Sequence, residues 1–357
     1  MRILHILNHV QEIGNGIVNV AVDLACLQAK AGNNVGVASA GGEYEALLTR
    51  YGVRHFKLDQ ARNPINLIKA SRSYQALIQE EQPDIVHAHM MTGVVLARVL
   101  KSRSKYSLVS TVHNEFQRSA VLMGLADRVI AVSKAVSRSM VRRGIAENKL
   151  RVITNGTLGS PRTRQLKEYL PISLQRPAIA TVAGMYRRKG IAELIDAFVE
   201  IAQDFPDSHL YLVGNGPDRA LFEAKAQSTP VAERIHFEGF QPEPQRYLLA
   251  SDIFVLASHR EPFGLAISEA REAGCAIVAS DVDGIPEALD GGQAGLLVPP
   301  ADSHALAAAL VQLLSNPNVL QRWQDQAQHN LEWLTAKRVN EETLAVYGEL
   351  LTLDKSS

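Results

Sequence analysis

The sequence predicts an α/β protein with two domains, each built on a doubly wound parallel sheet. Three observations lead to this prediction. The chain has 357 residues, which is too long for one ordinary hydrophobic core. Short apolar segments alternate with segments of helical periodicity along the whole chain. A stretch rich in glycine and proline, residues 156–177, interrupts this alternation, which then starts again. Two such domains joined by a linker predict a cleft between them, where small-molecule sites concentrate.

In the first half, near-continuous apolar runs are typical of parallel strands that are covered on both faces. Helical patterns at Ile17–Ala29 and Ile65–Gln79 separate some of these runs. Strands are expected at Ile3–Leu7, Val35–Ala38, Ile85–Ala88, Leu108–Val112, Val129–Val132 and Arg151–Thr154.

In the second half, the segment Ile191–Ala202 places its apolar residues on one helical stripe. Strands and helices again alternate, so we predict a second Rossmann-like domain. Its strands are expected at Ala178–Val182, Leu210–Val213, Ile235–Phe237, Ile253–Leu256, Ala276–Ala279 and Gly295–Val298.

The composition is that of a soluble globular protein, with 46% hydrophobic and 21% charged residues. No apolar run approaches the roughly 18 residues that cross a bilayer, and the first residues show no signal-peptide pattern. The two cysteines, Cys26 and Cys275, are far apart, which argues against a disulfide framework and a cysteine zinc site. We therefore expect a cytoplasmic protein.

The net charge of zero conceals an asymmetry between the two halves. Residues 1–172 hold 23 Lys and Arg against 12 Asp and Glu, a formal charge of +11, and the rest of the chain carries −11. A basic half can face anionic lipid, nucleic acid or an anionic substrate, and scattered solvated charges explain it equally well. Nucleic acid is the weakest of these because the cations lack interleaved aromatic residues.

Two glycine-containing loops each join a predicted strand to a helix. Gly14-Asn15-Gly16 precedes the first helix, where backbone amides can bind an anion, although a plain tight turn explains it equally well. The dinucleotide-binding fingerprint is incomplete and no P-loop occurs, which weighs against NAD-dependent and ATP-hydrolysing enzymes. Gly184-Met185-Tyr186-Arg187-Arg188-Lys189-Gly190 carries three cations, so we favour a phosphate clamp over a solvated basic loop. For Gly214-Asn215-Gly216-Pro217, a ligand-binding turn and a purely geometric turn both stay open.

The segment 259–269 carries two carboxylates around the start of a predicted helix. Glu261 lies in the loop, the helix begins near Leu265, and Glu269 lies about one turn inside it. Free amides near Phe263, Gly264 and Leu265 can bind a sugar hydroxyl or a phosphate oxygen. Two carboxylates there suit a polyhydroxylated ligand, and compensation of the helix dipole is the alternative explanation.

In this order, the motifs resemble those of family 4, the retaining nucleotide-sugar glycosyltransferases also described as glycosyl transferases group 1. The resemblance covers nearly the whole chain and implies the GT-B fold, two Rossmann-like domains facing a central cleft. Besides the three glycine loops, it is carried by Pro83–His89, Thr111-Val112-His113, Ala126–Ser133, Asn155-Gly156, the Glu261/Glu269 pair with Phe263-Gly264-Leu265, Gly284–Glu287 and Gly295–Val298.

The resemblance assigns roles to individual residues. Glu269 would bind the nucleotide ribose, Glu261 the donor sugar and Lys189 the diphosphate. His113 would reach the donor sugar from the first domain, and Gly16 would approach the donor phosphate and the acceptor. The catalytic residues are thus Glu261, His113 and Lys189, and the further donor-binding residues are Gly16, Arg188, Gly214, Gly216, Phe263, Gly264, Leu265 and Glu269.

The glycine- and proline-rich stretch predicts domains of residues 1–165 and 166–339. The resemblance makes the first the acceptor-side domain and the second the nucleotide-sugar-binding domain, and it implies that a C-terminal helix at about 340–357 packs back onto the first. The expected reaction moves a sugar from a UDP- or GDP-sugar to a glycan or lipid-linked acceptor with retention, in cell-envelope polysaccharide or glycolipid synthesis. It needs no metal and no cofactor.

One departure from the family pattern leaves other functions open. Met185 stands where family members often carry an arginine, and Arg187 or Arg188 would have to supply that cation. A non-catalytic nucleotide-sugar-binding protein is therefore one alternative. Another GT-B enzyme, an epimerase or a phosphorylase, is the second.

The histidines give a prediction of their own. We predict that His87 and His89 point to opposite faces of their strand, which is poor geometry for one metal ion, and that they pack or order loops. His113 follows a buried strand, where a structural histidine is common, and only the resemblance gives it a catalytic role.

The basic first domain predicts peripheral contact with anionic lipid at the inner face of the plasma membrane. Each surface cation there contributes about 1 kcal/mol, and no amphipathic anchor is apparent. The cations expected to take part are Arg62, Lys69, Arg72, Lys101, Arg103 and Lys105.

Overall fold

The computed structural model describes residues 1–61, 64–101 and 104–353. By its contacts the chain divides into unit 1, Met1–Thr163 with Thr335–Ser357, and unit 2, Arg164–Leu334. Each unit contains one wholly parallel sheet, so the predicted pair of Rossmann-like domains is confirmed.

The sheet of unit 1 has seven strands in the order β3-β2-β1-β4-β5-β6-β7. Chain order reverses between β1 and β4, so the topological switch point lies between these two neighbours. The strands are β1 (Arg2–Ile6), β2 (Asn34–Ser39), β3 (Arg54–Lys57), β4 (Ile85–Ala88), β5 (Ser107–Val112), β6 (Arg128–Ala131) and β7 (Leu150–Val152). The helices are α1 (Gly16–Lys30), α2 (Glu45–Arg50), α3 (Pro64–Glu81), α4 (Met91–Val99), α5 (Lys134–Arg142) and α13 (Ala336–Leu353), with 3₁₀ helices η1 (Arg118–Leu125) and η2 (Glu147–Lys149).

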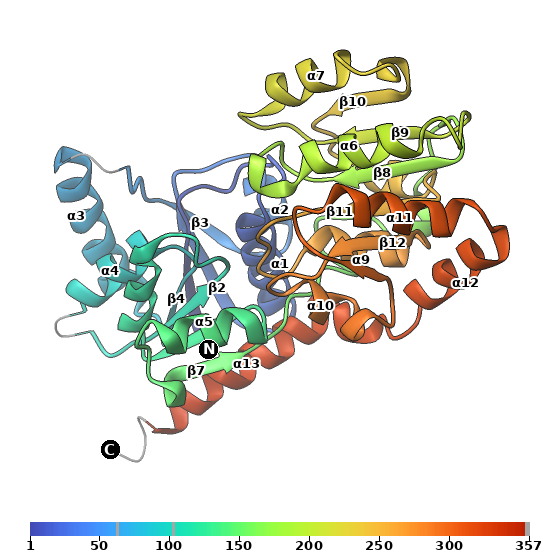
Figure 1. Ribbon diagram of the computed structural model, residues 1–357. Coiled ribbons are helices and arrows are strands. Elements are labelled where there is room, and N and C mark those ends of the chain that lie inside the picture. The colour runs from blue at the N-terminus through green and yellow to red at the C-terminus, as the bar shows by residue number, and fades with distance from the viewer. Residues whose placement is uncertain (62–63, 102–103, 354–357) are drawn as a thin grey trace. The chain divides into compact units, whose positions relative to one another are not determined.

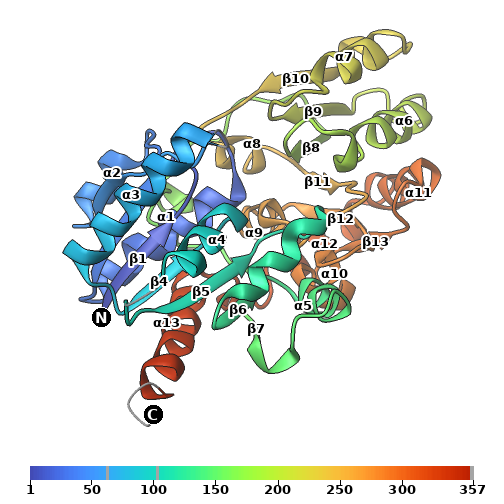
Figure 2. The ribbon, with the colours of Figure 1, turned by 90° about the vertical axis from the view of Figure 1, so that its left-hand side faces the viewer.

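The sheet of unit 2 has six strands in the order β10-β9-β8-β11-β12-β13, with its switch point between β8 and β11. Helix α6 packs between α7 and α11 (Figures 1 and 2). The strands are β8 (Ala178–Val182), β9 (His209–Val213), β10 (Ile235–Gly239), β11 (Ile253–Leu256), β12 (Ala276–Ser280) and β13 (Leu296–Val298). The helices are α6 (Ile191–Ile201), α7 (Arg219–Gln227), α8 (Gln245–Leu248), α9 (Leu265–Glu272), α10 (Ile285–Ala288), α11 (Ser303–Leu314) and α12 (Pro317–Ala327), with 3₁₀ helices η3 (Leu166–Glu168), η4 (Arg187–Lys189), η5 (Ala232–Arg234), η6 (Asp290–Gly292) and η7 (Glu332–Leu334).

Each sheet has a hydrophobic core of its own, in which its helices bury aliphatic side chains against the strands. The amphipathic stripe predicted for Ile191–Ala202 forms part of the core of unit 2, where Leu194, Ile195 and Phe198 are fully buried. The sequence prediction missed β3, a four-residue edge strand with no buried residue. Its sequence, RHFK, lacks the apolar run that identified the other strands.

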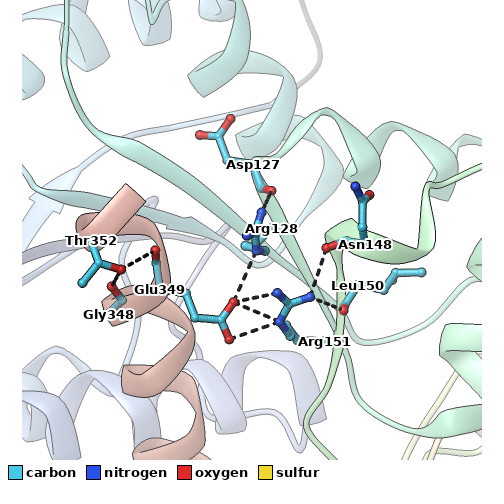
Figure 3. Close-up of polar contacts among 8 residues, drawn as sticks. All are labelled: Asp127, Arg128, Asn148, Leu150, Arg151, Gly348, Glu349 and Thr352. Atoms are coloured by element: carbon cyan, nitrogen blue, oxygen red, sulfur yellow. Dashed lines mark hydrogen bonds and ion pairs between the residues drawn. The ribbon is translucent and has the colours of Figure 1, made fainter. Parts of the chain in front are cut away.

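Helix α13 returns the chain to unit 1, where it packs against α1 and β5. Glu349 of α13 accepts hydrogen bonds from two arginines (Figure 3). One is Arg151 of β7, whose Nη2 lies 2.7 Å from the carboxylate, and the other is Arg128 of β6, whose Nε lies 3.5 Å away. Arg151 first, and Arg128 second, hold the pKa of Glu349 below its usual value. These contacts anchor the C-terminal helix to the sheet of unit 1.

Candidate functional site

Four loops of unit 2 follow strands that are neighbours in its sheet: β9, β8, β11 and β12. The carboxyl ends of parallel strands meet at one edge, and β8 and β11 flank the switch point, where ligands of doubly wound sheets bind. The structure thus brings together the predicted donor-binding residues that belong to this unit: Arg188, Lys189, Gly214, Gly216, Glu261, Phe263, Gly264, Leu265 and Glu269.

Glycines let these loops pack backbone against backbone. A Cβ atom on Gly190 would lie 1.8 Å from the Ala257 carbonyl oxygen, and one on Gly284 would lie 2.0 Å from that of Pro262. Gly214 and Gly216 are equally confined, with backbone atoms 2.0 and 2.5 Å from the added Cβ. No side chain fits at these distances, so the glycines fix how the loops interlock.

Lys189 and Glu261 form an ion pair across two of these loops. Lys189 lies in η4 after β8, and Glu261 lies in the loop after β11. Their side chains are only 14% and 10% exposed, so each charge depends on the other for compensation. Ser258 Oγ lies 3.4 Å from the Glu261 carboxylate, and the Glu261 backbone N–H donates to Asp283 at 3.0 Å. The two loops thus hold one cation and one anion side by side in a largely buried place.

The other residues of the basic loop divide between the core and the surface. Met185 stands at the position where members of the family that the sequence resembles often carry an arginine. Its side chain is fully buried in the core of unit 2. Arg187 is exposed, with its Nε 3.7 Å from Asp218. The Arg188 guanidinium lies over the ring of Tyr186, 5.3 Å from its centroid. Two arginines therefore directly precede Lys189 in sequence, but Met185 itself faces apolar side chains.

Helix α9 begins at Leu265, as predicted, and is preceded by Gly264 at φ +91°. Glycine provides no side chain to cap the helix, so the first amides must find partners outside it. Phe263 is buried and meets the ring of Trp333 edge-on, with centroids 6.0 Å apart. Glu269 lies one turn inside the helix and is half-buried. This start of α9 offers backbone N–H groups and a carboxylate within one turn of each other.

In unit 1, Gly16 is the first residue of α1, and Asn15 caps the helix by accepting a hydrogen bond from the Ile17 amide at 3.0 Å. Gly14 adopts φ +70° in the preceding loop, a conformation that favours glycine. The sequence prediction included Gly16 but not the cap residue Asn15 among the site residues.

His113 lies directly after β5 in the same unit and is buried. Its Nε2 lies 3.1 Å from Nδ1 of His89, which follows β4. The prediction that His87 and His89 point to opposite faces is wrong, because their ring centroids lie 4.2 Å apart. Residues two positions apart along a strand share a face, since side chains alternate with a period of two.

The hydrogen bonds continue beyond these three rings to residues that the sequence did not single out. His89 Nε2 lies 2.9 Å from His5 Nδ1, and His5 Nε2 lies 2.8 Å from Gln28 Oε1. His87 contacts the Tyr347 hydroxyl at 2.6 Å and Thr111 Oγ1 at 2.7 Å. We call these seven side chains the histidine network: His5, Gln28, His87, His89, Thr111, His113 and Tyr347.

Burial keeps the rings of the histidine network uncharged. Desolvation lowers the pKa of His5 to about 4 and that of His113 to about 3. It also lowers the pKa of His87 and His89 well below the usual value, with neighbouring histidines adding to the effect. Ring nitrogens of His5, His87 and His89 lie within 4.8 Å of one another, a spacing that could hold a metal ion. The prediction that these histidines form no metal site rested on His87 and His89 facing opposite ways, and the observed geometry removes that reason.

The cations predicted to face lipid lie in different settings. Lys69 and Arg72 are exposed on α3, and Lys105 is exposed before β5. Lys101 is half-buried, with its Nζ 3.1 Å from Asp127. Arg62 and Arg103 lie outside the described residues. Among the described helices, none combines the length and the apolar character needed to cross a membrane.

Comparison with known families and structures matches both units. The family described as glycosyl transferases group 1 matches residues 163–330, and glycosyltransferase family 4 matches residues 14–157. Together these matches cover most of both units.

Individual relatives agree with the family matches. The chain is 23% identical, over 88% of its length and 85% of the relative's, to an N-acetyl-α-D-glucosaminyl L-malate synthase of Bacillus anthracis. It is 27% identical to a lipopolysaccharide core biosynthesis glycosyltransferase of Rhizobium meliloti, over 78% of this chain and 75% of the other. Among solved structures it resembles Anabaena HepE in complex with UDP and glucose, with a TM-score of 0.81 and 19% identity over 98% and 99% of the two chains.

Proposed function

The chain belongs to the family 4 glycosyltransferases of the GT-B fold, and on that basis we propose that it transfers a glycosyl group from a nucleoside-diphosphate sugar with retention at the anomeric carbon. The observation that carries the proposal is the Lys189–Glu261 ion pair at the switch-point edge of unit 2. A diphosphate needs a cation, and a sugar beside it needs hydrogen-bond acceptors. The pair supplies both within one ion-pair distance.

Donor binding separates the pair in this proposal. Lys189 turns to the diphosphate, and Glu261 turns to the hydroxyls of the sugar, so that each charge exchanges one partner for another. Glu269 binds the ribose hydroxyls one turn inside α9, and the amides near Phe263, Gly264 and Leu265 take donor oxygens. Gly214 and Gly216 bring backbone close to the ligand. Support comes from the structurally similar HepE, whose solved complexes contain UDP, glucose and UDP-glucose.

Catalysis is electrostatic in this proposal. Lys189, with Arg188 beside it, and the first amides of α9 stabilise the charge that gathers on the departing diphosphate. That phosphate, rather than a protein base, helps to deprotonate the acceptor on the same face of the sugar. Glu261 orients the sugar and stabilises its positive charge without forming a bond to it. His113 and Gly16 contribute from unit 1, the former to the donor sugar and the latter to the donor phosphate and the acceptor.

We propose a glycan or lipid-linked acceptor in cell-envelope synthesis. Support for this choice comes from relatives whose names include lipopolysaccharide core biosynthesis and phosphatidyl-myo-inositol mannosyltransferase. We propose UDP- or GDP-sugars as donors and a reaction that needs no metal or cofactor.

The first test is donor consumption without acceptor or added metal. The full chain is incubated with a panel of UDP-, GDP- and ADP-sugars, and the released nucleoside diphosphate is quantified. We expect slow release from one donor, which is lost in Glu269→Ala and in Glu261→Ala. The matched control is Glu223→Ala, which removes a partly exposed glutamate of α7 that pairs with Arg219 in the same unit. Once the acceptor is found, the anomeric configuration of the product tests retention.

The outcomes separate the alternatives. Full activity of Glu261→Ala contradicts its role in the transfer. Tight binding of diphosphate with no donor consumed, even with acceptors supplied, indicates a binding protein. Release of sugar 1-phosphate that depends on inorganic phosphate indicates a phosphorylase.

We also propose peripheral contact of unit 1 with anionic membrane. Four apolar side chains after β5, Phe116, Val121, Leu122 and Leu125, are more than a third exposed. Basic side chains hold this segment, since Arg143 donates to the backbone of Gln117 and Lys149 to that of Gly124 and Ala126. Exposed apolar groups among cations suit the surface of an anionic bilayer.

Sedimentation with anionic liposomes at low salt tests this contact. We expect the chain to bind, and the double substitution Leu122→Asp with Leu125→Asp to weaken binding. Leu170→Asp is the control, because Leu170 is 78% exposed in unit 2. A protein that ignores anionic liposomes at low salt contradicts the proposal.

A further inference from the structure

The histidine network forms one unbroken line of hydrogen bonds through unit 1. It runs from His113 through His89, His5, Gln28, Tyr347 and His87 to Thr111. Its members come from β1, α1, β4, β5 and α13 or the residues directly after them. The proposed function uses only His113, which leaves six buried polar side chains without an assigned purpose.

The bond to Gln28 sets the direction of the hydrogen bonds. Gln28 Oε1 is a carbonyl oxygen and only accepts, so His5 must carry its proton on Nε2. A neutral imidazole has one N–H, so His5 Nδ1 accepts a hydrogen bond from His89 Nε2. His89 Nδ1 then accepts from His113 Nε2. His113 is left with its proton on Nε2 and a lone pair on Nδ1.

In the structure, the oxygen of the Gln28 amide faces His5 and its nitrogen faces Tyr347. The Gln28 amino group donates to the Tyr347 hydroxyl oxygen at 3.4 Å, and this hydroxyl donates to His87 Nδ1. His87 in turn donates from Nε2 to Thr111 Oγ1. If the amide were reversed, the Gln28 nitrogen would face His5, and every proton from His5 to His113 would change sides.

We propose that Gln28 and Tyr347 are positioning residues that fix the tautomer of His113, so that its Nδ1 accepts a hydrogen bond from a hydroxyl of the donor sugar. This inference rests on the proposed function, in which His113 contacts that sugar. The tautomer matters because the opposite one would present an N–H, which a hydroxyl can meet only as an acceptor. Residues of α1 and α13 thus control a ring that follows β5.

Binding of a metal ion by His5, His87 and His89 is the alternative role of the same rings. Each of the six ring nitrogens already has a hydrogen-bond partner at 2.6–3.1 Å. A metal would have to displace at least one of these partners from every ring.

Selective ¹⁵N labelling of histidine tests the tautomer, because long-range spectra distinguish a protonated ring nitrogen from a bare one. The test variants are Gln28→Leu and Tyr347→Phe, and His113→Ala assigns the signal. The matched control is Tyr74→Phe, because Tyr74 is also fully buried in unit 1 and donates to the Tyr106 hydroxyl at 2.9 Å outside the network.

We expect a proton on Nε2 of His113 in the wild type and in Tyr74→Phe, and a mixture of tautomers in Gln28→Leu. Donor turnover should fall about tenfold in Gln28→Leu and about threefold in Tyr347→Phe, and remain unchanged in Tyr74→Phe. UDP affinity should be unchanged in all three variants, because Glu269 and Lys189, proposed to bind the ribose and the diphosphate, lie in unit 2 and none of the substitutions alters Gly16. In Gln28→Glu, a protonated acid can accept from His5 and donate to Tyr347, so this variant should recover both tautomer and turnover.

A bare Nε2 on His113 in the wild type overturns the inference, as does a Gln28→Leu variant that keeps both tautomer and turnover. If Gln28→Leu fails to fold, the comparison of Tyr347→Phe with Tyr74→Phe decides, because each of these variants loses a hydroxyl and keeps its aromatic ring. One equivalent of zinc in the purified protein, lost in His5→Ala, overturns the inference in favour of a metal site. Unchanged donor turnover in His113→Ala contradicts the role of His113 in the proposed function instead, and the spectra still decide the tautomer.

Discussion

The switch-point edges of the two sheets are built from different chemical groups. In unit 2 the edge consists of backbone loops that glycines interlock, with one largely buried ion pair between them. In unit 1 it consists of buried uncharged imidazoles joined to an amide and two hydroxyls. The first arrangement offers a cation and the first backbone amides of α9, which suit a polyanion. The second offers neutral donors and acceptors in fixed directions, which suit hydroxyl groups.

The difference shows that the position of a functional side chain can be fixed by backbone packing or by side-chain hydrogen bonds. Interlocked glycine loops cannot shift without a steric clash, so they hold the backbone of Lys189 and Glu261 in place. The rings of unit 1 depend on partners from distant parts of the chain, because a neutral imidazole can reverse its donor and acceptor sides at little cost. We therefore expect unit 2 to be sensitive to added volume and unit 1 to lost polar atoms and to pH.

The largest expected effect is that of Gly190→Ala. The added Cβ would meet the Ala257 carbonyl oxygen at 1.8 Å, in a residue at φ +66°, so the free energy of unfolding of unit 2 should fall by about 4 kcal/mol. The control Gly291→Ala has a similar φ of +71° but no atom within 4 Å, so it should lose only about 1 kcal/mol. Urea denaturation followed by tryptophan fluorescence measures this, because both tryptophans, Trp323 and Trp333, lie in unit 2. Equal losses would show that the loops do not interlock.

The same contrast explains what could be predicted from the sequence. The site in unit 2 is made of short contiguous motifs at strand ends, so the positions of Lys189, Glu261 and the helix start at Leu265 followed from local patterns. Most of the sheet followed from apolar runs for the same reason. The network in unit 1 could not be predicted, because His5 lies inside an apolar strand and Tyr347 on the last helix, and only tertiary packing brings them together. The error at His87 and His89 came from misapplying the strand rule, because residues two apart along a strand share a face.

Lys189→Ala should give the second largest effect. In the proposed function it removes the cation that stabilises the departing diphosphate, so donor turnover should fall about a hundredfold, equal to about 2.7 kcal/mol of activation free energy. Lys225→Ala is the matched control, because it breaks an exposed ion pair with Asp196 at 2.6 Å in the same unit. Turnover of the two variants is compared at saturating donor. Equal rates would remove Lys189 from the mechanism.

Acidification should separate the two units. The usual histidine pKa is 6.5, whereas burial lowers that of His5 to about 4 and that of His113 to about 3. Between these values the unfolded chain binds protons that the folded rings do not, so the free energy of unfolding falls as the pH falls below 6.5. Each such ring contributes up to about 1.4 kcal/mol per pH unit, and we expect unit 1 to lose at least about 2 kcal/mol from pH 7 to pH 5.

Hydrogen exchange with mass spectrometry measures this loss for each unit, once the chemical exchange rate is corrected for pH. Peptides from β1 and β5 should lose more protection than peptides from β8 and β11. Unit 2 also contains two histidines of lowered pKa, His209 and His236, but both are only half-buried, so its loss should be smaller. Equal losses in both units would contradict a buried neutral network in unit 1.

The smallest expected effect concerns the helix that carries Tyr347 into the network. Glu349, two residues further along α13, is held by Arg151 and Arg128, yet its side chain is 39% exposed, so water screens the attraction. Glu349→Gln should therefore cost about 1 kcal/mol or less, measured as lost protection of α13 peptides at pH 7. Because the folded state lowers the pKa of Glu349, its stabilisation is present above the usual glutamate value of 4.5 and disappears as the pH falls below it. The control Glu341→Gln breaks an exposed pair with Lys337 at 3.7 Å on the same helix and should change nothing measurable. If Glu349→Gln also shifts the His113 ring signal, the anchor and the network are coupled through α13; if protection falls without such a shift, packing around Tyr347 alone holds its hydroxyl in place.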